Sequence, residues 1–308
     1  MKKVLFIVDV RDWAYHNRAK IWQRLLLNEF EIDIMFLEDY PQINKDNKDN
    51  LPLFDHEIYD GIMFFYHRAI VTSVLTNTPI PKEKVAICIN NDKWSLDGSS
   101  YTFNKYFRGV KLITGCNDNN VKEFKQYGVR VIKVTQVVDE TIFNIQRKEL
   151  VTKHKGSNFI VGWSGDPDNQ IKNVKWLSRA CYEADVKLNI QKELTLKQLS
   201  KWYNTVDCVI CVSQIEGGPN MILEAGACGI PIISTPVGLA PEIIQDKQNG
   251  FLIPHNRLDI LIDRIKKLVN SNSLRSKYAS NIHTTILKTW TYEKRLYEIR
   301  SALNYLCS

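Results

Sequence analysis

The residues best suited to chemistry form one dense segment in the second half of the chain. Two acids, Glu216 and Glu224, flank the run Gly217-Gly218-Pro219 and stand eight positions apart. The glycines permit close approach of a ligand to the backbone, and Pro219 suits the first position of a helix. The segment therefore predicts a helix start that faces a bound ligand.

The first amides of that helix predict an anion site. The backbone N–H groups of Asn220, Met221 and Ile222 lack helical partners and lie at the positive end of the helix dipole, which suits a phosphate group. Acids beside a phosphate are costly unless they bind other groups, and the vicinal hydroxyls of a sugar or a ribose suit ionised carboxylates. Glu224 could instead stabilise the N-terminus of its own helix.

Alternating strands and helices position this segment. Short runs rich in Val, Ile and Phe alternate with helical stretches from end to end, which predicts parallel sheets with helices on both faces. In the first half we expect strands at 4–9, 32–37, 61–67, 85–90, 111–114 and 130–138, and helices at 14–29 and 117–127. In the second half we expect strands at 159–163, 186–190, 208–212, 231–234 and 251–253, helices at 171–183, 195–203 and 220–228, and three further helices between 258 and 306.

The polar stretch 146–158 divides this pattern and predicts a linker. The expected domains are an N-terminal domain at 1–145, the linker at 146–158 and a C-terminal domain at 159–288. Both are Rossmann-like, with a cleft between them. Ligands of such sheets bind beyond the carboxyl ends of the strands, where the glutamate segment also falls.

Composition excludes several other classes of protein. The chain has 308 residues, of which 44% are hydrophobic, and no apolar run is long enough to span a membrane. The apolar run after Lys3 ends at Asp9, so it predicts a buried strand and no signal peptide. Seven cysteines, several of them in apolar stretches, indicate a reducing cytoplasm. Cys208 and Cys211 lie in a strand-like run, where residues three apart face opposite sides, so a shared metal is not expected.

Positive charge is concentrated towards the C-terminus. The net charge is +7, and residues 257–300 hold ten Lys or Arg against four acids. The plain interpretation is a solvated helix surface. The alternative is attraction to anionic lipid head groups or to an acidic acceptor. No signature of nucleic-acid binding accompanies this charge.

The pattern around the two acids resembles a known enzyme family. Glu216-x7-Glu224 is followed by Ala225-Gly-Ala-Cys-Gly229-Ile-Pro231, by Gly238-x3-Glu242-Ile-Ile and by Asn249-Gly250-Phe251-Leu252. This pattern resembles the retaining nucleotide-sugar glycosyltransferases of glycosyltransferase family 4, which have the GT-B fold. The likeness extends over about 159–254, including Tyr203-Asn204-x2-Asp207.

Two shorter segments add to the resemblance. Val137-Val138-Asp139-x3-Phe143 is similar to the family's segment at the domain junction. Trp290-Thr-Tyr-Glu-Lys resembles the helix that crosses back to the first domain, which implies that the C-terminal helix at 289–308 packs on the N-terminal domain.

The resemblance implies a role for each residue of the motif. Glu216 would orient the hydroxyls of the transferred sugar, and Glu224 would bind the ribose of the nucleotide. Lys172 corresponds to the lysine that neutralises the diphosphate as the sugar bond breaks, and a cation there stabilises the charge of the leaving group. Besides Glu224, the implied donor site comprises Gly165, Gly217, Gly218, Pro219, Asn220, Met221 and Ile222.

Asp166 departs from the family pattern, which usually has an arginine at that position, six residues before Lys172. An acid that faces a diphosphate would repel it. Either Asp166 points away, or another cation such as Arg179 or Lys192 takes the place of the arginine, and Lys192 is therefore a further candidate for binding the donor.

The first domain departs further from the family. The loop after the first strand reads Val10-Arg-Asp-Trp-Ala-Tyr-His16-Asn-Arg18, where the family often has glycines. Arg11, His16 and Arg18 are candidates for binding an anionic acceptor. The alternative is a surface turn before an ordinary helix.

A catalytic histidine of the family is also missing. After the fourth strand the chain reads Asn90-Asn91-Asp92, where the family commonly has a His-Asp pair. His67, at a strand end, is a candidate base, although such a histidine also serves as a structural hydrogen-bonding residue. Asp92 is a candidate for binding the acceptor. Retaining transfer can also proceed without a dedicated base, because the departing phosphate can accept the proton.

Metal dependence is not expected. Asp166-Pro-Asp168 is the Asp-x-Asp pattern that could hold a metal-bound diphosphate, but such a sequence is also common in turns. Lys172 and the helix start at Asn220 already supply positive charge. No dinucleotide-binding or P-loop glycine pattern is present, so no cofactor is expected.

We therefore expect a cytoplasmic two-domain GT-B enzyme, a hexosyl- or related glycosyltransferase. It would move a sugar from a UDP- or GDP-linked donor to an acceptor hydroxyl with retention, in surface polysaccharide or glycan biosynthesis. The acceptor would be a glycan or lipid-linked precursor, with peripheral contact at the inner face of the membrane and no nucleic acid partner. The alternatives are a silent subunit that binds a partner transferase, and a nucleotide-sugar epimerase or hydrolase.

Overall fold

The computed structural model describes residues 1–11, 14–39, 54–65, 80–90, 103–151 and 154–308. The chain forms two compact units, the first made of Met1–Thr135 and Leu296–Ser308 and the second of Gln136–Arg295. Each unit is a Rossmann-like α/β layer structure built on a parallel sheet, which confirms the predicted fold class. The unit boundary lies after Thr135, and the stretch 146–158 lies inside the second unit.

The sheet of the first unit has the strand order β2-β1-β3-β4-β5-β6. Its strands, all parallel, are β1 (Lys2–Val8), β2 (Phe30–Phe36), β3 (Gly61–Phe64), β4 (Val85–Ile89), β5 (Leu112–Gly115) and β6 (Val131–Lys133). The prediction of a strand over 130–138 was too long. After Lys133 the chain leaves the sheet, and Val138 forms an isolated bridge with Thr291.

Helices cover both faces of this sheet. On one face lie α1 (Ala14–Leu25) and α11 (Tyr292–Leu306), since Trp22 packs on Phe65 and Leu306 packs against Gly61. On the other face lie α4 (Asp118–Lys125) and a π-helix (Phe103–Phe107). Short 3-10 turns occur at Leu37–Asp39 and Lys82–Lys84. Helix α11 also joins the units in sequence, because it begins in the second and ends in the first.

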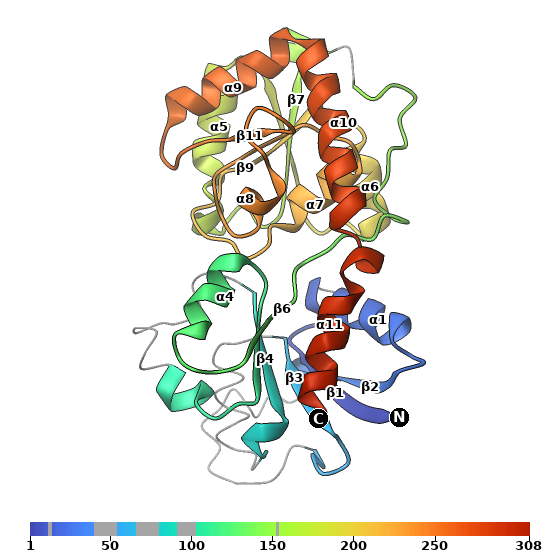
Figure 1. Ribbon diagram of the computed structural model, residues 1–308. Helices are drawn as coiled ribbons and strands as arrows, with labels where there is room; N and C mark the ends of the chain where they lie inside the picture. Colours follow the sequence, from blue (N-terminus) through green and yellow to red (C-terminus); the bar gives the residue numbers. More distant parts are fainter. Residues whose placement is uncertain (12–13, 40–53, 66–79, 91–102, 152–153) are drawn as a thin grey trace. The chain divides into compact units, whose positions relative to one another are not determined.

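The sheet of the second unit has the order β11-β10-β9-β7-β8. Its parallel strands are β7 (Ile160–Ser164), β8 (Lys187–Gln191), β9 (Cys208–Cys211), β10 (Ile232–Ser234) and β11 (Phe251–Leu252). Right-handed crossovers require α5 (Val174–Glu183) on one face and α6 (Leu196–Tyr203) and α7 (Asn220–Ala227) on the other. Figure 1 shows this arrangement, with α9 (Leu258–Asn270) beside α5 and α10 (Asn272–Thr289) beside α7.

Local sequence explains the helix ends of this unit. Thr195 and Gln198 form a capping box that starts α6. The helix predicted from Ile171 begins only at Val174, because Asn173 adopts a left-handed conformation between a 3-10 turn (Gln170–Lys172) and α5. The sequence reasoning missed the short helix α8 (Ala240–Ile243) and a 3-10 turn at Gly156–Asn158.

All seven cysteines are buried free thiols. Cys208 and Cys211 belong to β9, and burial raises the pKa of both thiols, that of Cys211 to about 11. A protonated thiol is a poor metal ligand and a poor nucleophile, so these residues serve as small core hydrophobes.

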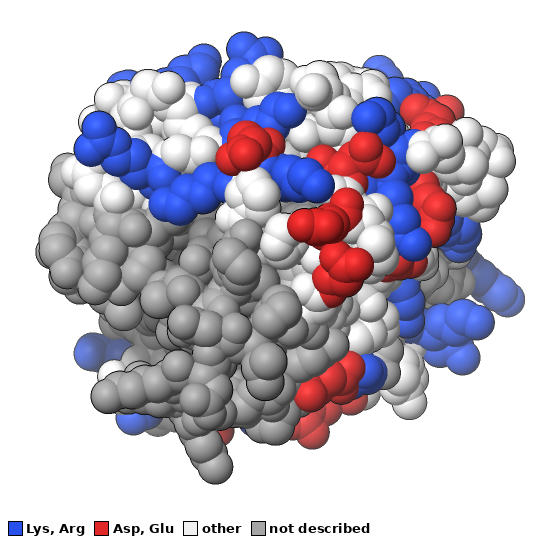
Figure 2. Space-filling model, turned by 90° about the horizontal axis from the view of Figure 1, so that it is seen from below, with Lys and Arg blue, Asp and Glu red and all other residues white. Residues whose placement is uncertain are grey.

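Ion pairs occupy part of the basic C-terminal stretch. Arg257 pairs with Asp259, Lys267 pairs with Asp263, and Arg275 is fully buried, where it donates to the carbonyl of Leu268. On the face drawn in Figure 2, the described Lys and Arg residues are interspersed with Asp and Glu. No helix in the described part of the chain is long and apolar enough to cross a membrane.

Candidate functional site

The second unit brings the predicted donor residues together at one edge of its sheet. Strands β7 and β9 are neighbours, but the chain continues from β7 to one side of the sheet and from β9 to the other. This is a topological switch point, where ligands of open α/β sheets bind beyond the carboxyl ends of the strands. The loop after β7 carries Gly165, and the loop after β9 carries the run from Ser213 to Pro219.

Lys172 and Glu216 form an ion pair in this site. Nζ of Lys172 lies 2.5 Å from Oε1 of Glu216. The turn that carries Lys172 is tied to the loop after β9, because the amide of Gln214 donates to the carbonyl of Ile171 at 2.9 Å. Asn173, with φ at +57°, then ends the turn. Asparagine tolerates this left-handed conformation better than most residues, so the sequence supports the geometry.

Glu216 is well supported inside the site. The hydroxyl of Ser213 donates to the same oxygen, Oε1, at 2.7 Å. The side chain of Glu216 is 14% exposed, and that of Lys172 is 29% exposed. Two donors on one carboxylate oxygen fix the orientation of this side chain. The second oxygen, Oε2, accepts no hydrogen bond from the described residues.

Glu224 belongs to a separate hydrogen-bonded chain. The hydroxyl of Tyr203 donates to Oε2 of Glu224 at 2.9 Å, and the Ser164 hydroxyl lies 2.9 Å from the same tyrosine oxygen. Burial raises the pKa of Glu224 to about 7, although the bond from Tyr203 opposes that shift. Glu224 lies beyond the first turn of α7, which holds no acid, so a helix-capping role does not account for it.

The start of α7 differs from the prediction in two respects. Pro219 is the N-cap, with φ −68° and ψ 102°, and the first helical residue is Asn220. The amide of Ile222 is not free, because it donates to the carbonyl of Pro219 at 3.0 Å in a tight turn. The predicted anion site is thereby reduced to two amides, those of Asn220 and Met221.

Two glycines shape the loop beside this helix start. A Cβ at Gly238 would lie 2.1 Å from the carbonyl oxygen of Gly217, to which the amide of Leu239 donates at 2.9 Å. A Cβ at Gly218 would lie 2.2 Å from Oε1 of Gln136. Gly238 excludes larger residues because its neighbour is backbone, whereas a Cβ at Gly218 would require the side chain of Gln136 to shift.

The position of Gly165 also favours glycine, but for a different reason. Its φ is +141°, and a Cβ there would meet the ring of Trp163 at 3.0 Å. The amide of Gly165 donates to the carbonyl of Gln191, which ties the loop after β7 to β8. The loop therefore turns sharply at the edge of the site.

Asp166 pairs with a cation in the structure. Nζ of Lys192 lies 3.1 Å from its carboxylate, and this contact lowers the pKa of Asp166. Arg179 instead pairs with Glu183 on the surface of α5, at 2.7 Å. Of the two substitutes considered for the missing arginine, Lys192 is thus the one that lies beside Asp166. Within the described ranges, no group of three or more His, Cys, Asp or Glu residues could hold a metal.

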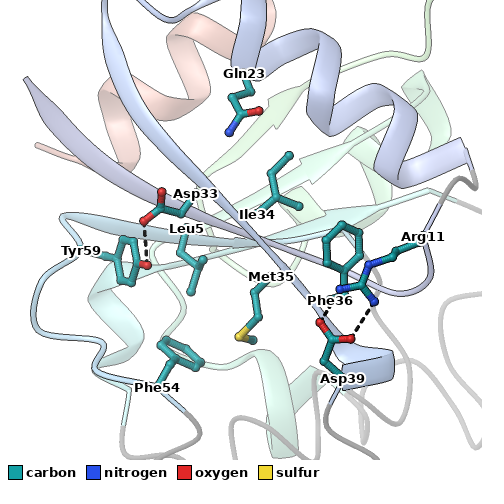
Figure 3. A pocket seen from close by; sticks show the side chains of 10 residues that line it. All are labelled: Leu5, Arg11, Gln23, Asp33, Ile34, Met35, Phe36, Asp39, Phe54 and Tyr59. Carbon is teal, nitrogen blue, oxygen red and sulfur yellow. Dashed lines mark hydrogen bonds and ion pairs between the residues drawn. The ribbon is translucent and has the colours of Figure 1, made fainter.

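The candidates for acceptor binding in the first unit occupy different environments. Arg11 forms a two-pronged ion pair with Asp39, 2.6 Å for each bond, and lies over the ring of Phe36. These three residues line a cavity of about 460 Å³ (Figure 3), together with Leu5, Gln23, Asp33, Ile34, Met35, Phe54 and Tyr59. His16 is buried and packs edge-on against Phe36.

Arg18 is buried at the carboxyl edge of the first sheet, where it donates to Asn90. His67 and Asp92 lie outside the described residues, so their assigned roles stay predictions.

Several residues of the site were missed from sequence. Tyr203 and Ser164 form the chain to Glu224, Ser213 supports Glu216, and Gln136 lies against Gly218. Ser164 and Ser213 were detectable as polar residues at or just after a strand end. Gln136 gave no signal, because its placement depends on a contact between segments about eighty residues apart.

Comparison with known proteins gives the family context. The sequence model of the family described as "Glycosyl transferases group 1" matches residues 140–284. The poly(ribitol-phosphate) α-N-acetylglucosaminyltransferase of Staphylococcus aureus is 26% identical over 113 residues, 35% of this chain. That stretch covers 23% of the relative, so the chain matches about a quarter of that protein's length.

Solved structures share the fold over the whole chain. Sucrose-phosphate synthase from Thermosynechococcus elongatus superposes with a TM-score of 0.76 at 10% identity and covers 99% of both chains. HepE from Anabaena, solved in complex with UDP-glucose, has a TM-score of 0.75 at 15% identity, over 99% of this chain and 100% of its own. The chain therefore has the GT-B fold, and the match to the glycosyl transferases group 1 model lies within its second unit.

Proposed function

We propose that the protein is a retaining glycosyltransferase that moves a sugar from a nucleotide diphosphate sugar to an acceptor hydroxyl. The observation that carries this proposal is the convergence of Lys172, Glu216 and Glu224 at the switch point of the second sheet. The group 1 domain match over the same unit supports it, and so does the structural similarity to HepE, which was solved with UDP-glucose.

The donor would occupy the second unit. Glu224 would accept hydroxyls of the ribose, and the amides of Asn220 and Met221 would donate to the diphosphate at the positive end of α7. Lys172 would neutralise the charge that develops on the diphosphate as the bond to the sugar breaks. Glu216 would bind the hydroxyls of the sugar through Oε2, which accepts no hydrogen bond within the described ranges.

Lys172 would change partner during the reaction. It neutralises Glu216 in the structure, and a diphosphate carries more negative charge than a single carboxylate. A bound donor would therefore draw the ammonium group towards its phosphates, which would free Glu216 for the sugar. Because Lys172 and the helix start supply the positive charge, we infer that the reaction needs no metal.

The transfer step follows from these positions. The bond between the anomeric carbon and the diphosphate oxygen breaks, and both electrons leave with the nucleoside diphosphate. The acceptor hydroxyl attacks the same face of the sugar, and the departing phosphate oxygen takes its proton. Attack on the face that the leaving group vacates gives retention of configuration, and no separate base is needed.

The acceptor is proposed to be a glycan or another surface polymer bound by the first unit. The name of the Staphylococcus aureus relative gives poly(ribitol-phosphate) as its acceptor, which supports a polymer of this kind. Location in the cytoplasm, with contact to an anionic membrane, stays a further proposal. The contact would use exposed lysines of the last three helices, such as Lys266, Lys277 and Lys288.

The test is transfer from a radiolabelled panel of UDP- and GDP-sugars to a cell-envelope glycan fraction, with and without a chelator. We expect transfer with one nucleotide, resistance to the chelator, and an anomeric configuration in the product that matches the donor. An inverted product would contradict the retaining mechanism. Epimerised donor or free sugar in place of transfer would indicate an epimerase or a hydrolase.

A further inference from the structure

Arg18 is a buried cation whose charge is not balanced within the described residues. The residue is 6% exposed, and its Nη2 donates to Oδ1 of Asn90 at 2.8 Å. Its Nε and Nη1 are buried and have no hydrogen-bond partner among the described residues. In the described part of the chain, no carboxylate forms an ion pair with this guanidinium.

The position of Arg18 places these donors where ligands of such sheets bind. Long side chains on a helix lean towards its N-terminus, and the N-terminus of α1 follows the carboxyl end of β1. Asn90 directly follows β4, and its amide nitrogen donates to the carbonyls of Phe65 and Cys88. The guanidinium is therefore fixed at the carboxyl edge of the sheet, beside the switch point between β1 and β3.

The surroundings of Arg18 are aromatic and neutral. The guanidinium carbon lies 5.1 Å from the ring centre of Trp22 and 5.6 Å from those of Tyr15 and Phe65. Burial raises the pKa of Tyr15, so this phenol supplies no negative charge at neutral pH. Cation–π contacts offset part of the cost of burying the charge, but they satisfy neither of the unbonded N–H groups.

The nearby acids have other partners. Asp39 forms a bidentate ion pair with Arg11. Asp9, at the end of β1, has an interaction of its own, and its effect on the pKa of Tyr15 is opposite to that of Arg18. A buried guanidinium without a charged partner destabilises the folded state, unless a bound ligand pairs with it.

We propose that Arg18 binds an oxyanion, a phosphate or carboxylate group, that the acceptor carries. This inference rests on the proposed function, because it assigns the acceptor to the first unit. The aromatic rings would exclude water and strengthen the contact, and the bond from Asn90 would hold the guanidinium in place. The acceptor is thereby restricted to an anionic glycan or anionic polymer unit.

The test uses the whole chain, with inorganic phosphate as the probe. Thermal unfolding is followed in up to 50 mM phosphate, against chloride at matched ionic strength. The wild-type protein and three variants are compared, Arg18→Met, Arg179→Met as an exposed control, and Lys172→Met to remove phosphate binding in the second unit. Sulfate and acetate then distinguish a tetrahedral anion from a carboxylate.

We expect phosphate or acetate to raise the Tm of the wild-type, Arg179→Met and Lys172→Met proteins by about 2 °C, and to leave Arg18→Met unchanged. Without anion, Arg18→Met should melt no lower than the wild-type protein, because it removes an unpaired buried charge. Two results would overturn the proposal. One is an equal anion response in the wild-type and Arg18→Met proteins, and the other is an Arg18→Met protein that melts several degrees lower or does not fold.

The failure of this inference is distinguishable from that of the proposed function. The same unfolding assay is run with UDP and GDP in place of phosphate. If a nucleotide raises the Tm of the wild-type and Arg18→Met proteins equally, the result supports the donor site, whether or not phosphate raises the Tm. A missing nucleotide response would contradict the proposed function and leave the anion result at Arg18 standing.

Discussion

Nζ of Lys172 and Oε1 of Glu216 lie 2.5 Å apart, although the two residues come from loops that follow different strands of one sheet. The loop of Lys172 is tied to the other loop by the bond between Gln214 and Ile171. The cation proposed for the leaving group and the acid proposed for the sugar therefore form one coupled unit before any donor arrives.

Substitution at this pair should abolish transfer and leave the fold intact. Glu216→Gln and Lys172→Met should each lower kcat about 100-fold or more, since each removes a group that acts in the transition state. The pair is partly exposed, so Tm should change by no more than about 2 °C. Steady-state kinetics and thermal unfolding measure both effects.

A matched ion pair supplies the control. Arg179 and Glu183 also pair at 2.7 Å in the second unit, but on the exposed surface of α5. Glu183→Gln should transfer at the wild-type rate. If the double variant of Glu216 and Lys172 loses the full product of the two single losses, the two residues act independently and the coupled unit is disproved.

The stability of the ligand-free protein should fall as pH rises through neutrality. The pKa of Glu224 is raised to about 7, so the folded protein holds a proton that the unfolded chain releases near pH 4.5. The proton on Glu224 therefore adds up to about 3 kcal/mol to the free energy of unfolding. This gain is fully present below about pH 4.5 and is lost as the pH rises through 7.

Urea unfolding between pH 5 and 8 measures this effect as a difference between wild-type and Glu224→Gln proteins. The amide cannot ionise, so the variant should lack this part of the pH dependence. Parallel curves for the two proteins would show that Glu224 is an ordinary acid with no shifted pKa.

Gly238→Ala should damage the donor loop far more than its backbone conformation alone predicts. A Cβ there would lie 2.1 Å from the oxygen of Gly217, whereas Gly128 also has a positive φ, +71°, and nothing within 4 Å. Gly128→Ala should cost about 1–2 kcal/mol, the price of the left-handed conformation. Gly238→Ala should cost clearly more, as measured by urea unfolding, and equal losses would disprove the close packing of the two loops.

Local patterns were sufficient to predict most of the fold. Runs of Val, Ile and Phe predicted the strands of both sheets, and the helices predicted from 117 and 195 begin at the capping residues Asn117 and Thr195. The predicted final strand of the first unit was too long. Val134 still donates to the carbonyl of Gly115 at the end of β5, but Val138 is buried where it bridges Thr291, outside the sheet.

The candidate site was predictable only in part. The glutamates and glycines stand close together in sequence, so spacing alone identified them. The partners of Glu224 could not be predicted, since Tyr203 reaches it from α6 and Ser164 from the end of β7. That Arg18 has no charged partner in the described part of the chain is likewise visible only in three dimensions, because it depends on which groups surround the side chain.

The most direct test of the central claim is a calorimetric titration of the protein with UDP and GDP at pH 6 and pH 8. We expect one nucleotide to bind, and to bind more tightly at pH 8, where Glu224 is ionised and accepts the ribose hydroxyls. Glu224→Gln should bind more weakly and equally at both pH values. Absence of heat with either nucleotide, or binding that Glu224→Gln leaves unchanged, would contradict a nucleotide-sugar site in the second unit.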